Sequence, residues 1–273
     1  MKNREKYIDI EKVIAAKNQN LVKWMPGFML RYIKRIVHEK DINETMARVG
    51  DRKGFEFLEG VLIEVLNTNI VLEGLENIPP EGGCIIASNH PLGGLDGMAL
   101  MYAVGKVRPD IKFLVNDILL NVKNLEQFFI PVNKVGENPR AATRLIEETY
   151  AQDIAILVFP AGLVSRKLPE GVEDLEWKKS FVAKALKYKK DIVPAHIDGR
   201  NSNWFYNLSN WRRKLGIKAN VEMFYLADEM FRQRNQTITI RFGNKIPYES
   251  LDRSKTHQQW ATEIREKVYA LQS

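Results

Sequence analysis

The sequence predicts an α/β fold: a mostly parallel sheet that is flanked by helices and preceded by an N-terminal amphipathic helical segment. Two observations predict it. From about residue 69 onward, short apolar runs alternate with stretches of helical periodicity, which is the pattern of a parallel sheet covered by helices. The chain of 273 residues is also 45% hydrophobic and 27% charged, an ordinary globular composition that excludes collagen-like and wholly disordered chains.

The N-terminal segment, residues 1–68, is predicted to be helical, basic and membrane-associating. Residues 1–40 contain ten Lys and Arg against four Asp and Glu, so they hold most of the net charge of +7. Within residues 21–37, apolar side chains recur at helical spacing after Pro26, which suits the first turn of a helix. Such a helix lies in a membrane interface, where its cations meet anionic headgroups, or it packs on the domain with a solvated basic face. The sequence leaves both interpretations open.

The remaining residues, 69–273, are expected to form one α/β domain, because no repeat, low-complexity stretch or linker divides them. The predicted strands are Ile70–Leu72, Cys84–Ala87, Lys112–Val115, Phe128–Val132, Ile154–Phe159, Ile192–Ile197 and Thr237–Phe242. The predicted helices lie near residues 97–105, 117–126, 139–150, 175–189, 222–234 and 256–271, and residues 41–68 are expected to add one or two more.

Cysteine content and hydropathy limit the cellular location. Cys84 is the single cysteine, which excludes a disulfide framework and a cysteine-based metal site. The longest run without a charged residue, 82–95, has 14 residues, whereas a spanning helix needs about 20. Because the N-terminus also lacks an apolar signal-type stretch, we expect a peripheral protein on the cytoplasmic face of a membrane. No nucleic-acid partner is expected, since no zinc-finger, RNP or Gly-x-x-Gly signature occurs.

A loop with catalytic side chains follows the predicted strand Cys84–Ala87. His90 and Asp96 are separated by five residues that include Gly93 and Gly94, and a helical pattern begins directly afterwards. Ligands of α/β sheets bind outside the carboxyl ends of the strands, and a histidine held by a carboxylate acts as a general base. The same pattern is also typical of a structural turn, with Asp96 as a helix N-cap.

Further loops after strands carry a family resemblance. The Asn-His…Asp block around His90, the block ending at Asn133, the Phe-Pro-Ala-Gly block at 159–162 and the apolar run with Pro194 occur in a characteristic order. Over residues 68–245 they resemble the glycerolipid acyltransferase family, which contains the 1-acylglycerol-3-phosphate acyltransferases. Other stretches, Asp174 with Trp177 among them, resemble its hemolysin-like or lyso-aminolipid branch.

The resemblance implies a mostly parallel α/β fold with His90 as the general base and Asp96 as the carboxylate that orients it. It implies neither a cofactor nor a metal site. Implied substrate contacts are Asn89, Gly93, Gly94, Asn133, Lys134, Pro160, Gly162, Ser165, Arg166 and Arg200.

Three positions depart from the family blocks. The family has four residues between its His and Asp, whereas this chain has five, and Gly93 with Gly94 can absorb the extra one. Asn133 stands where an Arg is expected. Ala161 replaces a Glu, and the Arg of that block is displaced to Arg166. A headgroup pocket with fewer cations favours an acceptor with less negative charge.

The expected activity is transfer of a fatty acyl chain from acyl carrier protein or acyl-coenzyme A to the hydroxyl of a lysolipid. Two rivals remain open. A lipid ester hydrolase would use a Gly-x-Ser-x-Gly nucleophile motif, which this sequence lacks. A non-catalytic peripheral membrane protein on the same fold is favoured by Asn133 and Ala161. Residues 199–221, aromatic and basic without an acidic residue, suit headgroups, an acidic carrier protein or a solvated loop.

Overall fold

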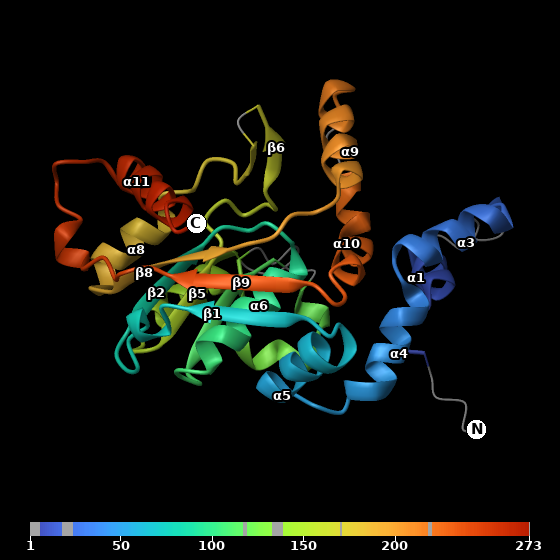
Figure 1. Ribbon diagram of the computed structural model, residues 1–273, viewed down its shortest axis with the longest axis horizontal. Helices are drawn as coiled ribbons and strands as arrows, with labels where there is room; N and C mark the ends of the chain where they lie inside the picture. Colours follow the sequence, from blue (N-terminus) through green and yellow to red (C-terminus); the bar gives the residue numbers. More distant parts are fainter. Residues whose placement is uncertain are drawn as a thin grey trace.

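The computed structural model (Figure 1) describes residues 6–17, 24–116, 119–132, 139–169, 171–217 and 220–272. A seven-stranded sheet in the order β1-β9-β8-β2-β5-β3-β4 forms its centre. Its strands are β1 (Asn69–Glu73), β2 (Cys84–Ser88), β3 (Ile111–Val115), β4 (Phe129–Pro131), β5 (Ala155–Val158), β8 (Asp191–Ile197) and β9 (Thr237–Phe242).

The strand directions confirm a mostly parallel sheet. Strands β8, β2, β5, β3 and β4 are parallel neighbours. Strand β9 pairs antiparallel with β8 and parallel with β1, so these two run the opposite way at one edge. All seven strands lie where the sequence predicts them, to within a few residues at each end. The carboxyl ends of the five parallel strands therefore meet at one edge of the sheet, as the prediction of the site requires.

Helices cover both faces of the sheet, and successive side chains of each strand point to opposite faces. On one face, α5 (Gly54–Glu59), a π-helical turn η1 (Gly60–Val65) and α6 (Gly94–Gly105) pack with residues such as Ile86. On the other face, α8 (Ser180–Tyr188) and α11 (His257–Tyr269) pack with its neighbours Ile85 and Ala87. Helix α7 (Pro139–Tyr150) contributes Tyr150 to this second cluster.

The N-terminal segment contains α1 (Ile10–Lys17), α3 (Gly27–Ile36) and α4 (Glu39–Val49). Figure 1 shows α1 and α3 extending from one end of the domain. No residue of α3 is buried, and the side chain of Phe28 is 66% exposed. The buried residues of the cluster that contains Ile86 begin at Val49, and the partly buried Ile42 and Met46 of α4 pack against it. Among the described residues, no helix is long and apolar enough to cross a bilayer.

Three elements differ from the prediction. The helix expected at 117–126 is instead two 3₁₀ turns, η3 (Leu119–Asn121) and η4 (Lys123–Phe128), and 117–118 lie outside the described residues. A hairpin of β6 (Arg166–Leu168) and β7 (Gly171–Glu173) was not predicted, since its strands have three residues each. Residues 199–221 contain helix α9 (Asn203–Lys214), followed by η5 (Val221–Tyr225) and α10 (Leu226–Arg232). Helix α9 escapes prediction because its sequence is polar and aromatic without an apolar stripe.

Candidate active site

His90 lies in the loop after β2, beside the end of β5. The register of the parallel strands pairs Ala87 with Val158, so the residues that follow these strands emerge side by side. The His90 ring consequently stacks on Phe159, with ring centroids 4.1 Å apart and an interplanar angle of 16°. The stack holds the imidazole in one plane at the carboxyl edge of the sheet.

Asp96 contacts the Nδ1 edge of the His90 ring. Nδ1 of His90 lies 3.0 Å from both carboxylate oxygens of Asp96, and the Asp96 side chain is fully buried. The carboxylate also accepts the backbone N–H groups of Leu92 and Gly93, at 2.7 and 3.2 Å. Gly93 has φ 82° and ψ −127°, which a residue with a Cβ avoids. This glycine absorbs the extra residue of the loop and brings Asp96 back to the ring.

The electrostatics of the pair suit a general base. Burial on its own lowers the pKa of His90, but the carboxylates of Asp96 and Asp174 together hold that pKa above its ordinary value. Because Nδ1 faces a carboxylate, the proton of the neutral ring is on Nδ1, and the lone pair of Nε2 is left to accept a proton. The Asp96 carboxylate also favours the protonated form of the ring.

Asp174, which is not among the predicted site residues, joins three loops of the site. Its side chain accepts hydrogen bonds from the Ser165 hydroxyl at 2.6 Å, the Trp177 indole at 2.9 Å and the backbone N–H of His90 at 3.1 Å. Burial raises the pKa of the Asp174 carboxyl, whereas the hydrogen bonds from Ser165 and Trp177 and the charge of His90 oppose that shift. Since all three partners donate, the carboxylate is the form that this site fits.

Replacing Asp174 with Asn should shift the pH dependence of turnover. The charge of Asp174 contributes to the raised pKa of His90, so its removal lowers that pKa. Because the base acts when it is neutral, the acid limb of the kcat/KM profile should move to lower pH. A pH–rate profile of the Asp174→Asn variant checks this. Ser165→Ala, which removes a donor without removing the charge, is the control. An acid limb that does not move would show that Asp174 has no electrostatic effect on the base.

Several predicted substrate contacts are buried in the protein instead. Both amide atoms of Asn89 pair with the backbone of Ile197, at 3.0 and 2.7 Å, and this pairing fixes the loop to β8. Ser165, which is 1% exposed, bonds Asp174. Arg166 is 2% exposed and donates to Glu222 at 3.1 Å. Burying a guanidinium requires such a partner, and the headgroup role of Arg166 stays a prediction.

The other predicted contacts divide into three groups. Gly93, Gly94, Pro160 and Gly162 line a cavity together with His90. Arg200 is exposed, bonds Asn203 and does not line that cavity. Asn133 and Lys134 lie outside the described residues.

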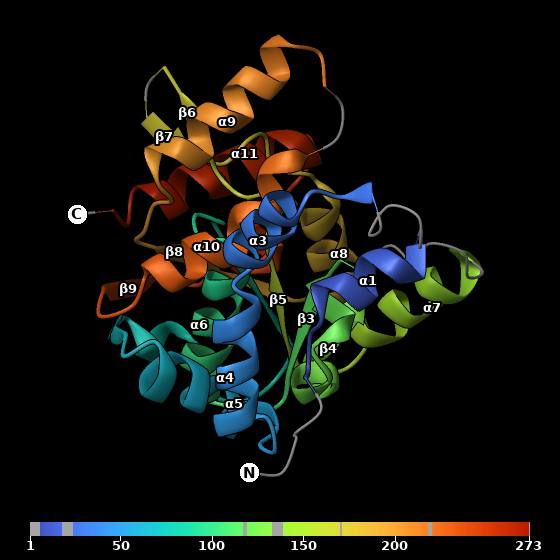
Figure 2. The same ribbon diagram turned by 90° about the vertical axis from the view of Figure 1, so that its right-hand side faces the viewer.

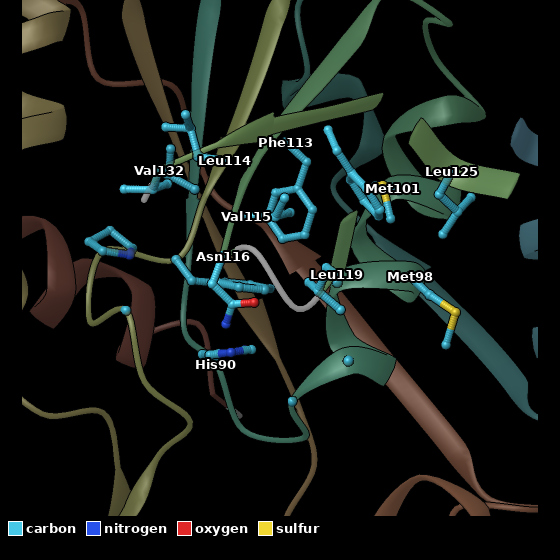
Figure 3. A pocket seen from close by; sticks show the side chains of 18 of the residues that line it. His90, Met98, Met101, Phe113, Leu114, Val115, Asn116, Leu119, Leu125 and Val132 are labelled. Carbon is cyan, nitrogen blue, oxygen red and sulfur yellow. The ribbon is translucent and has the colours of Figure 1, made fainter. Parts of the chain in front are cut away.

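The cavity beside His90 has a volume of about 420 Å³ and a mostly apolar wall. In Figure 3, His90 lies on one side of it, and Met101 and Leu125 lie on the other. These apolar side chains were not predicted to line a site, because they look like ordinary core residues in the sequence. Besides His90, the one cationic side chain lining this cavity in the described part of the chain is that of Lys178. The described residues contain no cluster of three His, Cys, Asp or Glu side chains placed to hold a metal ion.

Comparisons with known proteins agree with this fold and with the motifs. Residues 12–273 match a family described as "Acyltransferase". The chain is 43% identical over 265 residues to proteins named "Lyso-glycine lipid O-acyltransferase" from Bacteroides thetaiotaomicron and Phocaeicola vulgatus, covering 97% of this chain and 97% and 95% of the relatives. The crystal structure of PlsC, the 1-acyl-sn-glycerophosphate acyltransferase of Thermotoga maritima, is similar in fold, with a TM-score of 0.51, 17% identity and coverage of 96% and 98% of the two chains. The chain therefore belongs to the acyltransferase family.

Proposed function

We propose that the protein is a peripheral membrane lysolipid O-acyltransferase that uses His90 as its general base and an acyl thioester as its donor. The observation that carries this proposal is the His90–Asp96 pair at the edge of a deep apolar cavity. The pair supplies proton transfer, and the cavity supplies a site for a hydrocarbon chain. A lysolipid hydroxyl and the thioester of acyl carrier protein or acyl-coenzyme A are the two reactants that such a site combines.

The reaction needs one proton carrier and no covalent enzyme intermediate. Nε2 of His90 removes the proton of the acceptor hydroxyl while its oxygen attacks the thioester carbonyl. The tetrahedral intermediate then collapses, the C–S bond breaks, and the proton on His90 passes to the departing thiolate. The N-terminus of α6, where Gly94 and Gly97 line the cavity, favours negative charge on the intermediate.

The apolar cavity suits the acyl chain of the donor. Its lining includes Met98, Met101, Phe113, Leu119 and Leu125, which present no charged group to a hydrocarbon. Met side chains adapt to chains of irregular shape because they have three rotatable bonds. A chain that enters from the His90 end would therefore place its carbonyl beside the base.

The acceptor is a lyso-aminolipid whose headgroup carries a single carboxylate. The curated relatives are named for lyso-glycine lipid. In this chain, buried Arg166 is paired with Glu222, so the cation that lines the cavity beside His90 is Lys178, which is exposed. A single ammonium matches one carboxylate better than a phosphate monoester, which a fork of Arg groups binds more completely.

The acceptor assignment predicts that a lyso-aminolipid is used at least as well as lysophosphatidic acid. In Lys178→Ala, kcat/KM for the lyso-aminolipid should fall by about tenfold, which corresponds to one charge-assisted hydrogen bond. Steady-state rates with both acceptors at a fixed thioester concentration measure this. Lys179→Ala, at an exposed neighbour that does not line the cavity, is the matched control. A tenfold or greater preference for lysophosphatidic acid in the wild type would contradict the assignment.

A further inference from the structure

We propose that α9 and η5 form, with α3, one docking surface for an anionic lipid bilayer, and that the acceptor enters the cavity from this surface. Four rings make up the aromatic row that connects these elements: Tyr32 on α3, Tyr225 on η5, and Trp204 and Trp211 on α9. This inference rests on the proposed function only in the identity of the acceptor, because binding to a bilayer is measured without turnover.

The aromatic row is continuous although its members are far apart in sequence. The hydroxyls of Tyr32 and Tyr225 are 2.6 Å apart. Tyr225 contacts Trp204 with ring centroids 6.2 Å apart, and Trp204 contacts Trp211 with centroids 6.1 Å apart. Figure 2, which faces this end of the molecule, shows α3 beside α10 and below α9. The three elements therefore present a single surface.

This surface exposes more apolar side chain than a solvated face needs. Trp211 is 53% exposed, Leu215 74% and Phe224 65%, and Trp24, three residues before α3, is 85% exposed. Soluble proteins rarely leave such side chains in one patch unless it binds something. Trp and Tyr in particular are enriched where a membrane meets water, since their rings have an apolar body and a polar edge.

The charge of the surface identifies the bilayer as its occupant. Arg31 and Arg35 on α3, and Arg213 and Lys214 at the end of α9, are exposed, and none of the four forms an ion pair with a residue that the structure describes. Cations beside inserted aromatic rings match anionic headgroups above a hydrocarbon layer. An acidic carrier protein would bind the cations but would offer no hydrocarbon layer to bury Trp211 and Leu215.

The surface is also continuous with the cavity. Met223 of η5 and Met230 of α10 line the cavity with His90, and Met223 is the immediate neighbour of the exposed Phe224. A lysolipid held in the bilayer can therefore reach the base without leaving an apolar environment. This explains why helix α9, which lies outside the catalytic loops, carries aromatic side chains on its exposed face.

The test compares the double variant Trp211→Ser with Leu215→Ser against Leu145→Ser, which removes an exposed leucine from α7. Binding is measured by flotation with vesicles of phosphatidylglycerol and phosphatidylcholine. We expect the double variant to lose at least about tenfold in vesicle affinity and the control to lose none. With a vesicle-embedded acceptor, kcat/KM should fall by a similar factor, whereas a monomeric short-chain acceptor should be used as well as by the wild type.

Unchanged vesicle affinity in the double variant would overturn the inference. A second variant, Arg213→Glu with Lys214→Glu, can also overturn it. If this variant has a raised KM for acyl carrier protein and unchanged vesicle binding, the surface binds the carrier. If the double variant unfolds at a lower temperature than the wild type, Phe224→Ser supplies the same comparison. Loss of vesicle binding in a protein that acylates no lysolipid would refute the proposed function and leave the docking surface standing.

Discussion

Replacing His90 with Ala should reduce acyl transfer by at least about 10²- to 10⁴-fold, the range that a positioned general base contributes. The fold should survive, because the ring borders a cavity and the Asp96 carboxylate keeps the backbone donors of Leu92 and Gly93. Thiol release from an acyl thioester, measured with acceptor present, gives the rate. The melting temperature of the same preparation shows whether the variant is folded.

His38 provides a matched control for this experiment. It is also a histidine held by carboxylates, but both of its ring nitrogens are occupied, Nδ1 by Asp41 at 2.8 Å and Nε2 by Asp228 at 2.9 Å. It therefore has no free nitrogen to accept a substrate proton. His38→Asn keeps a residue type that tolerates the φ of 54° at this position and should retain turnover. Near-native turnover in folded His90→Ala would refute the mechanism.

Replacing Met101 with Trp should shorten the acyl chain that the enzyme accepts. Met101 is 1% exposed and lies across the cavity from His90 (Figure 3). A larger ring there occupies the space of the chain terminus. Excluding four methylenes, at about 0.8 kcal/mol each, lowers kcat/KM for long donors by roughly 200-fold. Short donors should be affected much less.

The measurement is a series of kcat/KM values across saturated donors of increasing length, for the wild type and for Met101→Trp. Leu145→Trp, at an exposed position on α7, controls for the added ring itself. If Met101→Trp lowers the rate equally for every chain length, the cavity is not where the chain terminus lies. If the profile is unchanged, the acyl chain binds elsewhere.

The sequence predicts the sheet well because its central strands are short, nearly uninterrupted apolar runs. Strand β2 is buried at every position, which is typical of a strand covered on both faces. The position of His90 and Asp96 after that strand follows from the same pattern. Their contact, at 3.0 Å, depends on the backbone conformation of Gly93. The local sequence does indicate that conformation, because a glycine stands there.

The rest of the site depends on contacts between distant segments. Arg166 looks like a headgroup ligand in the sequence, but its partner Glu222 lies 56 positions away on an element whose placement no local pattern reveals. Asp174 reaches His90 across 84 positions for the same reason. Lys178 lies in a stretch without regular structure before α8, so only the fold brings it to the cavity.

For the amphipathic helix at the N-terminus, the sequence predicts the helix itself but not what covers its apolar face. Its sequence fits both a membrane-bound and a packed helix, because the two differ in what covers the apolar face rather than in the face itself. In the structure no residue of α3 is buried. Among the described residues, Phe28, Met29 and Tyr32 of α3 are exposed, and their exposure supports the proposal of membrane docking.

The most direct test of lysolipid acyl transfer follows both products of one reaction. Purified protein is incubated with an acyl thioester and a lyso-aminolipid, and released thiol and diacylated lipid are quantified together. We predict that the two form in equal amounts, and that neither forms above background with His90→Ala. Thiol release without acylated lipid would show a thioesterase, and the absence of both products with acyl carrier protein and coenzyme A donors alike would contradict the account.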